Sequence, residues 1–297
     1  MYHNPVLLKE SVDGLDIKEN GIYVDVTFGG GGHSKEILKR LGTAGKLFAF
    51  DQDEDAQANN LDDERFVLIA ENFRYIAQFL KFYGIRKVDG ILADFGVSSH
   101  QFDQAERGFS TRFDADLDMR MSKRNTLSAF EVVNKYSYDD LRNVLFEYGD
   151  IRNANAMAKV IVASRESEEI RTTDALKRAL GQFLPEHKQH KILAQIYQAI
   201  RIEVNQEIAV IKEFLEQVPE LLNDNGRLSV ISYHSLEDRL VKRFIRAGQF
   251  EGEPEKDFYG NIEVPMKKVG GLIVPSREEI KQNNRARSAK LRIAEKL

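Results

Sequence analysis

The 297-residue chain contains no cysteine and no tryptophan, and it has only 6 prolines. The absence of cysteine excludes disulfides, thiolate nucleophiles and zinc sites built on cysteine. No apolar run approaches the roughly 18 residues that a membrane-spanning helix needs. The segment from Met1 to Glu10 lacks the basic flank and apolar core of a signal peptide. We therefore expect a cytoplasmic protein that does not contact a membrane.

Neither sign of charge dominates the chain. Lys and Arg number 43 against 47 for Asp and Glu, and hydrophobic residues make up 42%. This balance predicts a globular protein in which any nucleic-acid contact comes from a local basic patch. Of the six histidines only His187 and His190 lie close together in sequence. A solvated helix start explains them better than a metal pair, because no second cluster supplies further ligands, so we predict no metal site.

The first hundred residues alternate between short apolar runs and helical periods. Helical spacing predicts helices over residues 34–41 and 73–82, and Asp53 can cap a short helix that ends at Asn60. The apolar runs predict strands at residues 22–26, 46–50, 66–70 and 88–94. This alternation is typical of an α/β protein with a parallel, doubly wound sheet.

The pattern changes to helical periods alone between about Glu106 and Ala199. It resumes with a helix over 204–222 and a strand over 227–232, followed by an expected loop over 248–271 and a basic stretch over 281–297. We therefore predict an α/β domain formed by residues 1–105 and 200–297, with an inserted helical domain at 106–199 for substrate recognition. The helical periods of the insertion fall at 129–133, 138–148, 154–165 and 173–183.

A glycine-rich loop, Asp25-Val-Thr-Phe-Gly-Gly-Gly-Gly-His33, lies between the first predicted strand and the first helix. Glycines let a ligand approach the backbone closely, and the helix that follows offers unpaired N–H groups. Asp51 ends the next strand, where an acid suits hydrogen bonding to ribose hydroxyls. Together these features favour an adenosine-type cofactor on a Rossmann-like sheet over a plain flexible turn.

The identity of the cofactor follows from the residues around this loop. The dinucleotide fingerprint G-x-G-x-x-G needs a glycine at position 34, which is Ser34. Asp25 and Asp94 place two more acids at the carboxyl edge of the predicted sheet. Three carboxylates favour the cationic sulfonium of S-adenosylmethionine over a pyrophosphate. An NAD-type oxidoreductase is the rival hypothesis.

Several longer motifs resemble the bacterial ribosomal RNA cytosine-N4 methyltransferase family, called MraW or RsmH. They occur in order from about Asn4 to about Ala294 and so cover nearly the whole chain. His-Ser-Leu-Glu-Asp-Arg and Leu-Asp-Met-Arg-Met are the most specific of them. The matching segments lie at 27–34, 89–99, 106–110, 117–121, 198–205, 231–239 and 285–288.

The resemblance implies a class I S-adenosylmethionine-dependent methyltransferase with a Rossmann-like sheet and an inserted helical domain. It implies methylation of the N4 amine of a cytidine in 16S, small-subunit, ribosomal RNA. The partner would be this RNA or the assembled small subunit, and a homodimer is left open. Implied cofactor contacts are Gly31, Gly32, His33, Asp51, Phe73, Asp94 and Gln101. The chain departs from the usual family pattern at His100, Ala115, Asp116, Tyr233 (for Phe) and Asn284.

Transfer to the cytosine amine needs a hydrogen-bond acceptor, because the nitrogen lone pair is delocalised into the ring. Asp94, or a backbone carbonyl within 95–98, is the candidate acceptor. His234 is a second candidate, for contact with the base or a phosphate, although a capping role explains it equally well. The sequence argues against methylation at cytosine C5, because that reaction needs a cysteine nucleophile and the chain has none. Glu237 and Asp238 are as readily explained by pairing with Arg239 or Arg243 as by chemistry.

Contact with RNA is expected through three basic regions, near which Phe109, Phe113 and Tyr233 are candidates for stacking on an extruded base. Phe109 and Phe113 are equally compatible with the core. The alternatives to the main hypothesis are a methyltransferase of the same fold with another acceptor and a non-catalytic ribosome assembly factor. The basic regions comprise Arg107, Arg112, Arg120, Lys123 and Arg124; Lys242, Arg243 and Arg246; and the stretch 281–297.

Overall fold

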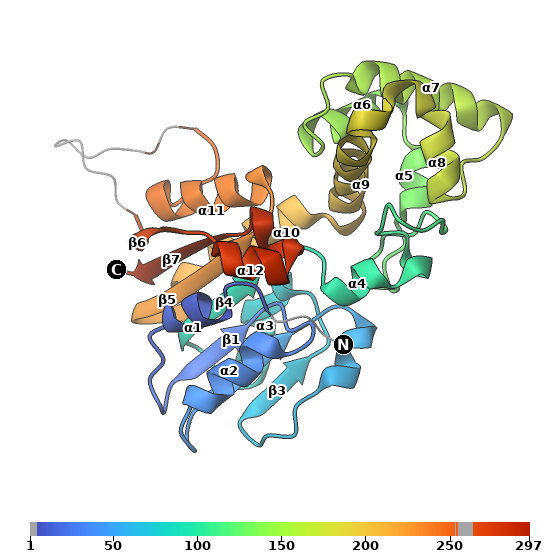
Figure 1. Cartoon of the computed structure of the whole chain (residues 1–297). Helices are drawn as coiled ribbons and strands as arrows, with labels where there is room; N and C mark the ends of the chain where they lie inside the picture. Colours follow the sequence, from blue (N-terminus) through green and yellow to red (C-terminus); the bar gives the residue numbers. More distant parts are fainter. Residues whose placement is uncertain (1–4, 253, 255–263) are drawn as a thin grey trace. The chain divides into compact units, whose positions relative to one another are not determined.

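The computed structural model describes residues 5–252, 254 and 264–297. The chain divides into two compact units, Met1–Gly96 with Ile208–Leu297, and Val97–Glu207 (Figure 1). The sequence placed these divisions at 105/106 and 199/200. The difference arises because Phe102 and Val204 both pack with the apolar core of the helical unit.

The first unit is built on a seven-stranded sheet with the strand order β3-β2-β1-β4-β5-β7-β6. Strands β1 to β5 pair in parallel, and β7 runs antiparallel to both of its neighbours. The predicted parallel sheet is therefore confirmed, with an antiparallel strand added near one edge. The strands are β1 (Ile22–Asp25), β2 (Lys46–Phe50), β3 (Phe66–Ile69), β4 (Val88–Asp94), β5 (Leu222–Ser232), β6 (Met266–Ile273) and β7 (Lys290–Lys296).

Helices cover both faces of this sheet (Figure 1). Successive residues of a strand point to opposite faces, so Tyr23 packs with Ile37 of α2 on one face while Val24 packs with Phe214 of α10 on the other. Asp53 caps a 3₁₀ helix, as expected, by accepting from the N–H of Asp55. The helical elements are α1 (Leu8–Asp13), α2 (Gly32–Arg40), η1 (Glu54–Asn59), η2 (Phe73–Tyr75), α3 (Ile76–Phe82), α10 (Glu207–Leu221), α11 (Ser235–Ala247), α12 (Arg277–Gln282) and η6 (Asn284–Ser288).

One expectation for the last part of the chain needs correction, and a second stretch contains elements that were not predicted. The loop expected over 248–271 gives way to β6 from Met266, although residues 253 and 255–263 of that stretch lie outside the described part of the chain. The basic stretch over 281–297 contains η6 and β7. Its alternating pattern forms a strand because Leu291 and Ile293 enter an apolar cluster while Arg292 pairs with Asp238.

The second unit is helical, and its described residues contain no strand beyond one isolated bridge between Asp116 and Thr172. Each predicted helical period falls on a helix, whose apolar face lines one core. Over the described residues of both units, no helix has the length and apolar character needed to cross a membrane. The elements are α4 (Ser99–Asp103), η3 (Ala105–Arg107), α5 (Ala129–Lys135), α6 (Tyr138–Glu147), α7 (Ala154–Ser167), α8 (Thr173–Ala179), η4 (Gly181–Phe183), η5 (Glu186–Lys188) and α9 (Gln189–Asn205).

Candidate functional site

The glycine loop between β1 and α2 rests on a buried carboxylate. Asp25 ends β1 and has no exposed surface. Its Oδ2 accepts a 2.7 Å hydrogen bond from the Ser34 hydroxyl, and its Oδ1 accepts one of 3.1 Å from the N–H of Thr27. Burial raises the pKa of Asp25 to about 6, against the lowering effect of these two bonds. The sequence placed Asp25 among the acids around a ligand, whereas in the structure it holds the loop from beneath.

The conformation of this loop requires glycine. Gly29 and Gly31 have φ values of 50° and 73°, in the left-handed region that favours residues without a Cβ. A Cβ on Gly31 would lie 2.9 Å from the Phe28 ring, and one on Gly32 would lie 2.1 Å from the Pro5 ring. Because α2 begins at Gly32, the unpaired N–H groups of its first turn belong to this loop. The glycines therefore let the loop pack against Phe28 and Pro5, while the unpaired N–H groups of the first turn of α2 can bind an anionic group.

Asp51 ties the glycine loop to the end of β2. Its Oδ2 accepts from the N–H of Gly29 at 2.7 Å, and its Oδ1 accepts from the N–H of Asp53 at 2.8 Å. Burial raises the pKa of Asp51 to about 6, while these two bonds lower it. Each carboxylate oxygen has two lone pairs, so Asp51 can also accept from a pair of ribose hydroxyls. The structure thus brings together the glycine loop and the acid that the sequence predicted as its partner.

Asp94 lies at the carboxyl end of β4, beside α2. Its backbone N–H donates to the Thr27 hydroxyl at 2.7 Å, and its Oδ1 accepts from the Tyr233 hydroxyl at 2.8 Å. The other oxygen, Oδ2, lies 3.9 Å from Nδ1 of His33. Burial raises the pKa of Asp94 to about 6, opposed by His33 and Tyr233. The Asp94 side chain is still 22% exposed, unlike that of Asp25, so a substrate can reach it.

His33 is buried, and its burial lowers its pKa, which favours the neutral imidazole. Its Nε2 lies 3.3 Å from the carbonyl oxygen of Val6. Asp94, whose Oδ2 lies 3.9 Å from Nδ1 of His33, and the Val6 carbonyl oppose this lowering of the His33 pKa. His33 therefore lines the carboxyl edge of the sheet beside Asp94.

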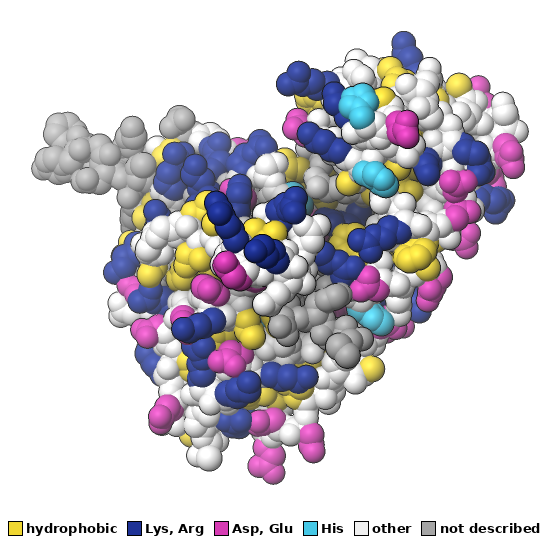
Figure 2. Space-filling view, viewed as in Figure 1, with side chains coloured by type: hydrophobic (Ala, Val, Ile, Leu, Met, Phe, Trp, Pro, Cys, Tyr) yellow, Lys and Arg dark blue, Asp and Glu magenta, His cyan; other side chains and the backbone are white. Residues whose placement is uncertain are grey.

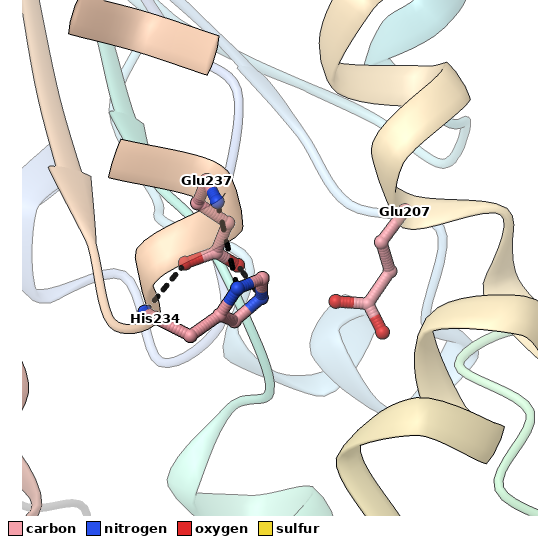
Figure 3. Close-up of side chains that lie close together, drawn as sticks. All are labelled: Glu207, His234 and Glu237. Atoms are coloured by element: carbon pink, nitrogen blue, oxygen red, sulfur yellow. Dashed lines mark hydrogen bonds and ion pairs between the residues drawn. The ribbon is translucent and has the colours of Figure 1, made fainter. Parts of the chain in front are cut away.

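His234 and Glu237 face each other at the start of α11 (Figure 3). Glu237 is fully buried, and its Oε1 lies 2.9 Å from Nε2 of His234. The N–H of Glu237 faces Nδ1 of the same ring at 3.5 Å, so His234 caps the helix. Glu207, also drawn in Figure 3, belongs to the helical unit and pairs there with Arg201 at 2.7 Å.

The sequence left open whether Glu237 and Asp238 pair with Arg239 or Arg243 or take part in chemistry, and the structure shows other partners for both acids. Glu237 accepts from the backbone N–H of Tyr233 at 2.7 Å in addition to facing His234. Asp238 pairs with Arg292 at 2.7 Å and with Lys290 at 3.3 Å. Arg239 and Arg243 were the only partners that the sequence suggested for these acids, because they are close in sequence on the same helix. The sheet instead brings Lys290 and Arg292 of β7 beside Asp238 of α11.

The remaining predicted contacts, Phe73 and Gln101, lie in different units. The Phe73 ring is half-buried and stacks on Phe95 with centroids 5.9 Å apart. Gln101 belongs to the helical unit, where its side-chain oxygen accepts from the N–H of Ser98 at 3.0 Å in the capping box of α4. All other predicted cofactor contacts belong to the first unit and lie at or after the carboxyl ends of its parallel strands.

The basic regions are only partly available to a partner. Arg107 is buried and donates to the carbonyl of Met121 at 3.1 Å, while Arg120 pairs with Asp118. Phe109 belongs to the core of the helical unit, and Phe113 is 47% exposed. On the first unit, Lys and Arg side chains gather over α11 and α12 (Figure 2). The exposed basic residues are Arg112, Lys123 and Arg124 in the helical unit and Lys242, Arg246, Lys281 and Arg287 in the first unit.

Sequence reasoning missed how the loops of this edge are fastened together. Asn59 donates to the carbonyl of Gly29 at 2.9 Å, and the hydroxyls of Thr27, Ser34 and Tyr233 each bind an acid of the site or its backbone. One signal was available for Tyr233. It follows β5, the predicted strand next to Asp94, and parallel strands end at the same edge of a sheet.

A family model and named relatives match nearly the whole chain. The model of the MraW methylase family matches residues 1–297. A protein of Flavobacterium johnsoniae named ribosomal RNA small subunit methyltransferase H is 71% identical over 296 residues, covering 100% of this chain and 98% of that protein. A protein of Cytophaga hutchinsonii with the same name is 55% identical over 298 residues, covering 100% of both. The crystal structure of an rRNA methylase from Streptococcus thermophilus aligns with a TM-score of 0.44 and 13% identity, over 97% of this chain and 95% of that one.

Proposed function

The chain belongs to the MraW methylase family, and from this premise we propose that it transfers a methyl group from S-adenosylmethionine to the N4 amine of a cytidine in small-subunit ribosomal RNA. The names of its relatives support the RNA of the small subunit as the substrate. The choice of N4 comes from the family resemblance, and the observation that supports it is the partly exposed carboxylate of Asp94 at the carboxyl end of β4, which can accept a proton from an amine. A methylase family also disfavours the oxidoreductase hypothesis.

The first unit offers groups that fit each part of this cofactor. The N–H groups of Gly32 and His33 suit its carboxylate end, because they lie in the first turn of α2. The N–H of Gly31 donates to the carbonyl of Phe28 at 2.7 Å, so Gly31 shapes the loop rather than donating to the cofactor. Asp51 is placed to accept from the ribose hydroxyls, and the half-buried Phe73 offers an aromatic face for the adenine. When bound, S-adenosylmethionine supplies a methyl group activated by a positive sulfur. Gln101, which the resemblance adds to these contacts, belongs to the helical unit.

Asp94 takes the proton that the reaction releases. It accepts a hydrogen bond from the N4 amine, which directs the nitrogen lone pair toward the methyl carbon. As the C–N bond forms, the C–S bond breaks and its electron pair stays on sulfur, and Asp94 accepts the N4 proton. The products are N4-methylcytidine, S-adenosylhomocysteine and a protonated carboxyl. A pKa of about 6 keeps Asp94 ionised at neutral pH and makes it more basic than an ordinary aspartate.

His234 has a supporting role in this proposal. Both of its ring nitrogens face Glu237, and the ring caps α11. We assign it to ordering the turn after β5 rather than to proton transfer. No covalent intermediate is required, because positioning and electrostatics can supply most of the rate.

The substrate RNA is proposed to bind through exposed basic residues of both units. Arg112, Lys123 and Arg124 belong to the helical unit, which we assign to substrate recognition. Lys281 and Arg287 belong to the first unit. Such side chains contact phosphates and position an RNA without reading its sequence. The protein would then act in the cytoplasm on this RNA or on the assembled small subunit.

The test uses methyl-labelled S-adenosylmethionine and small ribosomal subunits from cells that lack the activity. After the reaction the RNA is digested to nucleosides, which are separated. Label in N4-methylcytidine is the expected result. Label in another nucleoside would contradict the N4 assignment, and bound cofactor without any label would favour an assembly role.

A further inference from the structure

The turn after β5 lies directly beside the turn after β4. Asp94 pairs with Ile231 in the sheet register, and the N–H of Phe95 donates to the carbonyl of Ile231 at 3.0 Å. Tyr233 follows two residues later. The Tyr233 hydroxyl donates to Oδ1 of Asp94 at 2.8 Å. The sheet register thus brings the two residues side by side.

Tyr233 is itself held on several sides. Its backbone N–H donates to Glu237 at 2.7 Å, and its side chain packs against the apolar cluster that contains Leu291. Its ring also lies over the turn after β4, since a Cβ on Gly96 would be 3.6 Å from Cδ2 of Tyr233. A side chain fixed in this way holds its hydroxyl at one place on the Asp94 carboxylate.

The two oxygens of Asp94 therefore differ. Oδ1 is occupied by Tyr233, whereas Oδ2 lies 3.9 Å from Nδ1 of His33 and accepts no hydrogen bond from the described part of the chain. We propose that Tyr233 is a positioning residue for methyl transfer, which fixes the Asp94 carboxylate through Oδ1 so that Oδ2 accepts the N4 proton. This inference rests on the proposed role of Asp94.

The same hydrogen bond favours the ionised form of Asp94. The groups that face this carboxyl are His33 from α2, Tyr233, Asp25 from β1 and Glu237 from α11. Burial and the two acids raise the pKa of Asp94, while His33 and Tyr233 lower it. The Tyr233 hydroxyl stays protonated, because burial and its acidic neighbours raise its own pKa. Removal of that hydroxyl should therefore raise the pKa of Asp94 further.

Tyr233→Phe tests the proposal, because it removes one oxygen and keeps the ring. Single-turnover formation of N4-methylcytidine is measured from pH 5 to pH 9 at saturating cofactor. We expect the acidic limb of the profile to move to higher pH, so that the loss of rate is smallest above pH 8 and grows by a further factor of roughly five near pH 6 for a pKa change of about one unit. An equal loss at every pH would indicate a merely structural role and overturn the proposal.

The matched control is Tyr23→Phe. Tyr23 is a buried tyrosine of the same unit, and its hydroxyl accepts from the N–H of Lys18 at 2.7 Å instead of contacting an acid of the site. We expect its pH profile to keep the wild-type shape. A shift of its acidic limb equal to that of Tyr233→Phe would also overturn the proposal.

A second measurement separates this inference from the proposed function. The carboxyl of Asp94 is titrated by NMR in protein labelled with carbon-13 aspartate, and its signal is assigned as the one missing in Asp94→Asn. We expect a higher titration midpoint in Tyr233→Phe than in wild type. An unchanged midpoint overturns the inference even if the enzyme is active. A wild-type enzyme that makes no N4-methylcytidine contradicts the proposed function instead.

Discussion

The Ser34 hydroxyl donates a 2.7 Å hydrogen bond to Oδ2 of Asp25, a carboxylate with no exposed surface. This contact fastens the first turn of α2 to the end of β1 and so shapes the glycine loop between them. The arrangement costs stability, because burial raises the pKa of Asp25 from 3.8 to about 6. A carboxyl with a raised pKa favours the folded state most below its unfolded pKa, and that contribution is lost as the pH rises through its folded pKa.

Asp25→Asn should therefore stabilise the cofactor-free protein at pH 8. The amide keeps the shape and can bond to both Ser34 and Thr27, but it carries no charge to desolvate. We expect a gain on the order of 1–3 kcal/mol at pH 8 and a smaller gain at pH 5, where the wild-type carboxyl is largely protonated in the folded state. Calorimetric unfolding at both pH values measures the difference. An equal change at both would show that ionisation of Asp25 does not set this cost.

Asp51→Asn should weaken binding of S-adenosylmethionine. The variant loses the charge and one of the acceptor oxygens that serve the ribose hydroxyls and the N–H of Gly29. Hydrogen bonds to a charged group contribute about 1.5–3 kcal/mol, so we expect a Kd roughly 10- to 100-fold higher. Because the pKa of Asp51 is about 6, wild-type affinity should also fall below pH 6.

Titration calorimetry measures the Kd of S-adenosylmethionine for Asp51→Asn and the pH dependence of the wild-type Kd. Asp63→Asn is the control, because Asp63 pairs with Arg65 at 2.6 Å and contacts none of the site residues among those described. Unchanged affinity in Asp51→Asn would remove Asp51 from the cofactor site.

The central part of the fold could be predicted from the sequence, because fully buried parallel strands are continuous apolar runs. Residues 88–94 are such a run and coincide with β4. The alternation from Lys290 to Ile293 is typical of a strand, but β7 was not predicted, because four residues within a basic stretch fit a solvated segment equally well. β6 was harder, since Gly270 and Gly271 interrupt its pattern and only sheet pairing with β7 defines it.

Those residues of the candidate site that lie at the carboxyl ends of predicted strands could be identified from the sequence. Asp51 and Asp94 could be named because each ends a predicted strand, and such ends meet at one edge. The order of the strands could have placed Tyr233 at the same edge as Asp94, but the hydrogen bond between them depends on the register of β5 against β4, which the sequence does not show. The burial of Asp25 and Arg107 was also hidden, since sequence patterns do not show which charged residues the fold encloses.

Replacing Lys281 and Arg287 together with alanine should weaken RNA binding without affecting the cofactor. Both are exposed on the first unit, Lys281 in α12 and Arg287 in η6. Each lost phosphate contact lowers the dependence of log K on log salt by about 0.7–0.9. We therefore expect the slope of log K against log salt concentration to be shallower by roughly 1 to 2 in filter-binding assays with small-subunit RNA.

The control for this pair is the double alanine variant of Lys35 and Lys39, two exposed lysines of α2. A salt dependence that falls equally in both double variants would show a general charge effect. No fall in the Lys281 and Arg287 variant would exclude this surface from the RNA interface.

The role of Asp94 is tested by single-turnover methyl transfer in Asp94→Asn, at saturating S-adenosylmethionine and pH 8. The amide can still accept from Tyr233 but cannot take the N4 proton. Asp89→Asn serves as control, because Asp89 lies on the same strand and accepts from the N–H of Ile22 at 2.9 Å. We predict that Asp94→Asn binds cofactor but forms N4-methylcytidine about 10²–10⁴ times more slowly, while Asp89→Asn stays near the wild-type rate. A wild-type rate in Asp94→Asn would contradict the assignment of Asp94 as the proton acceptor.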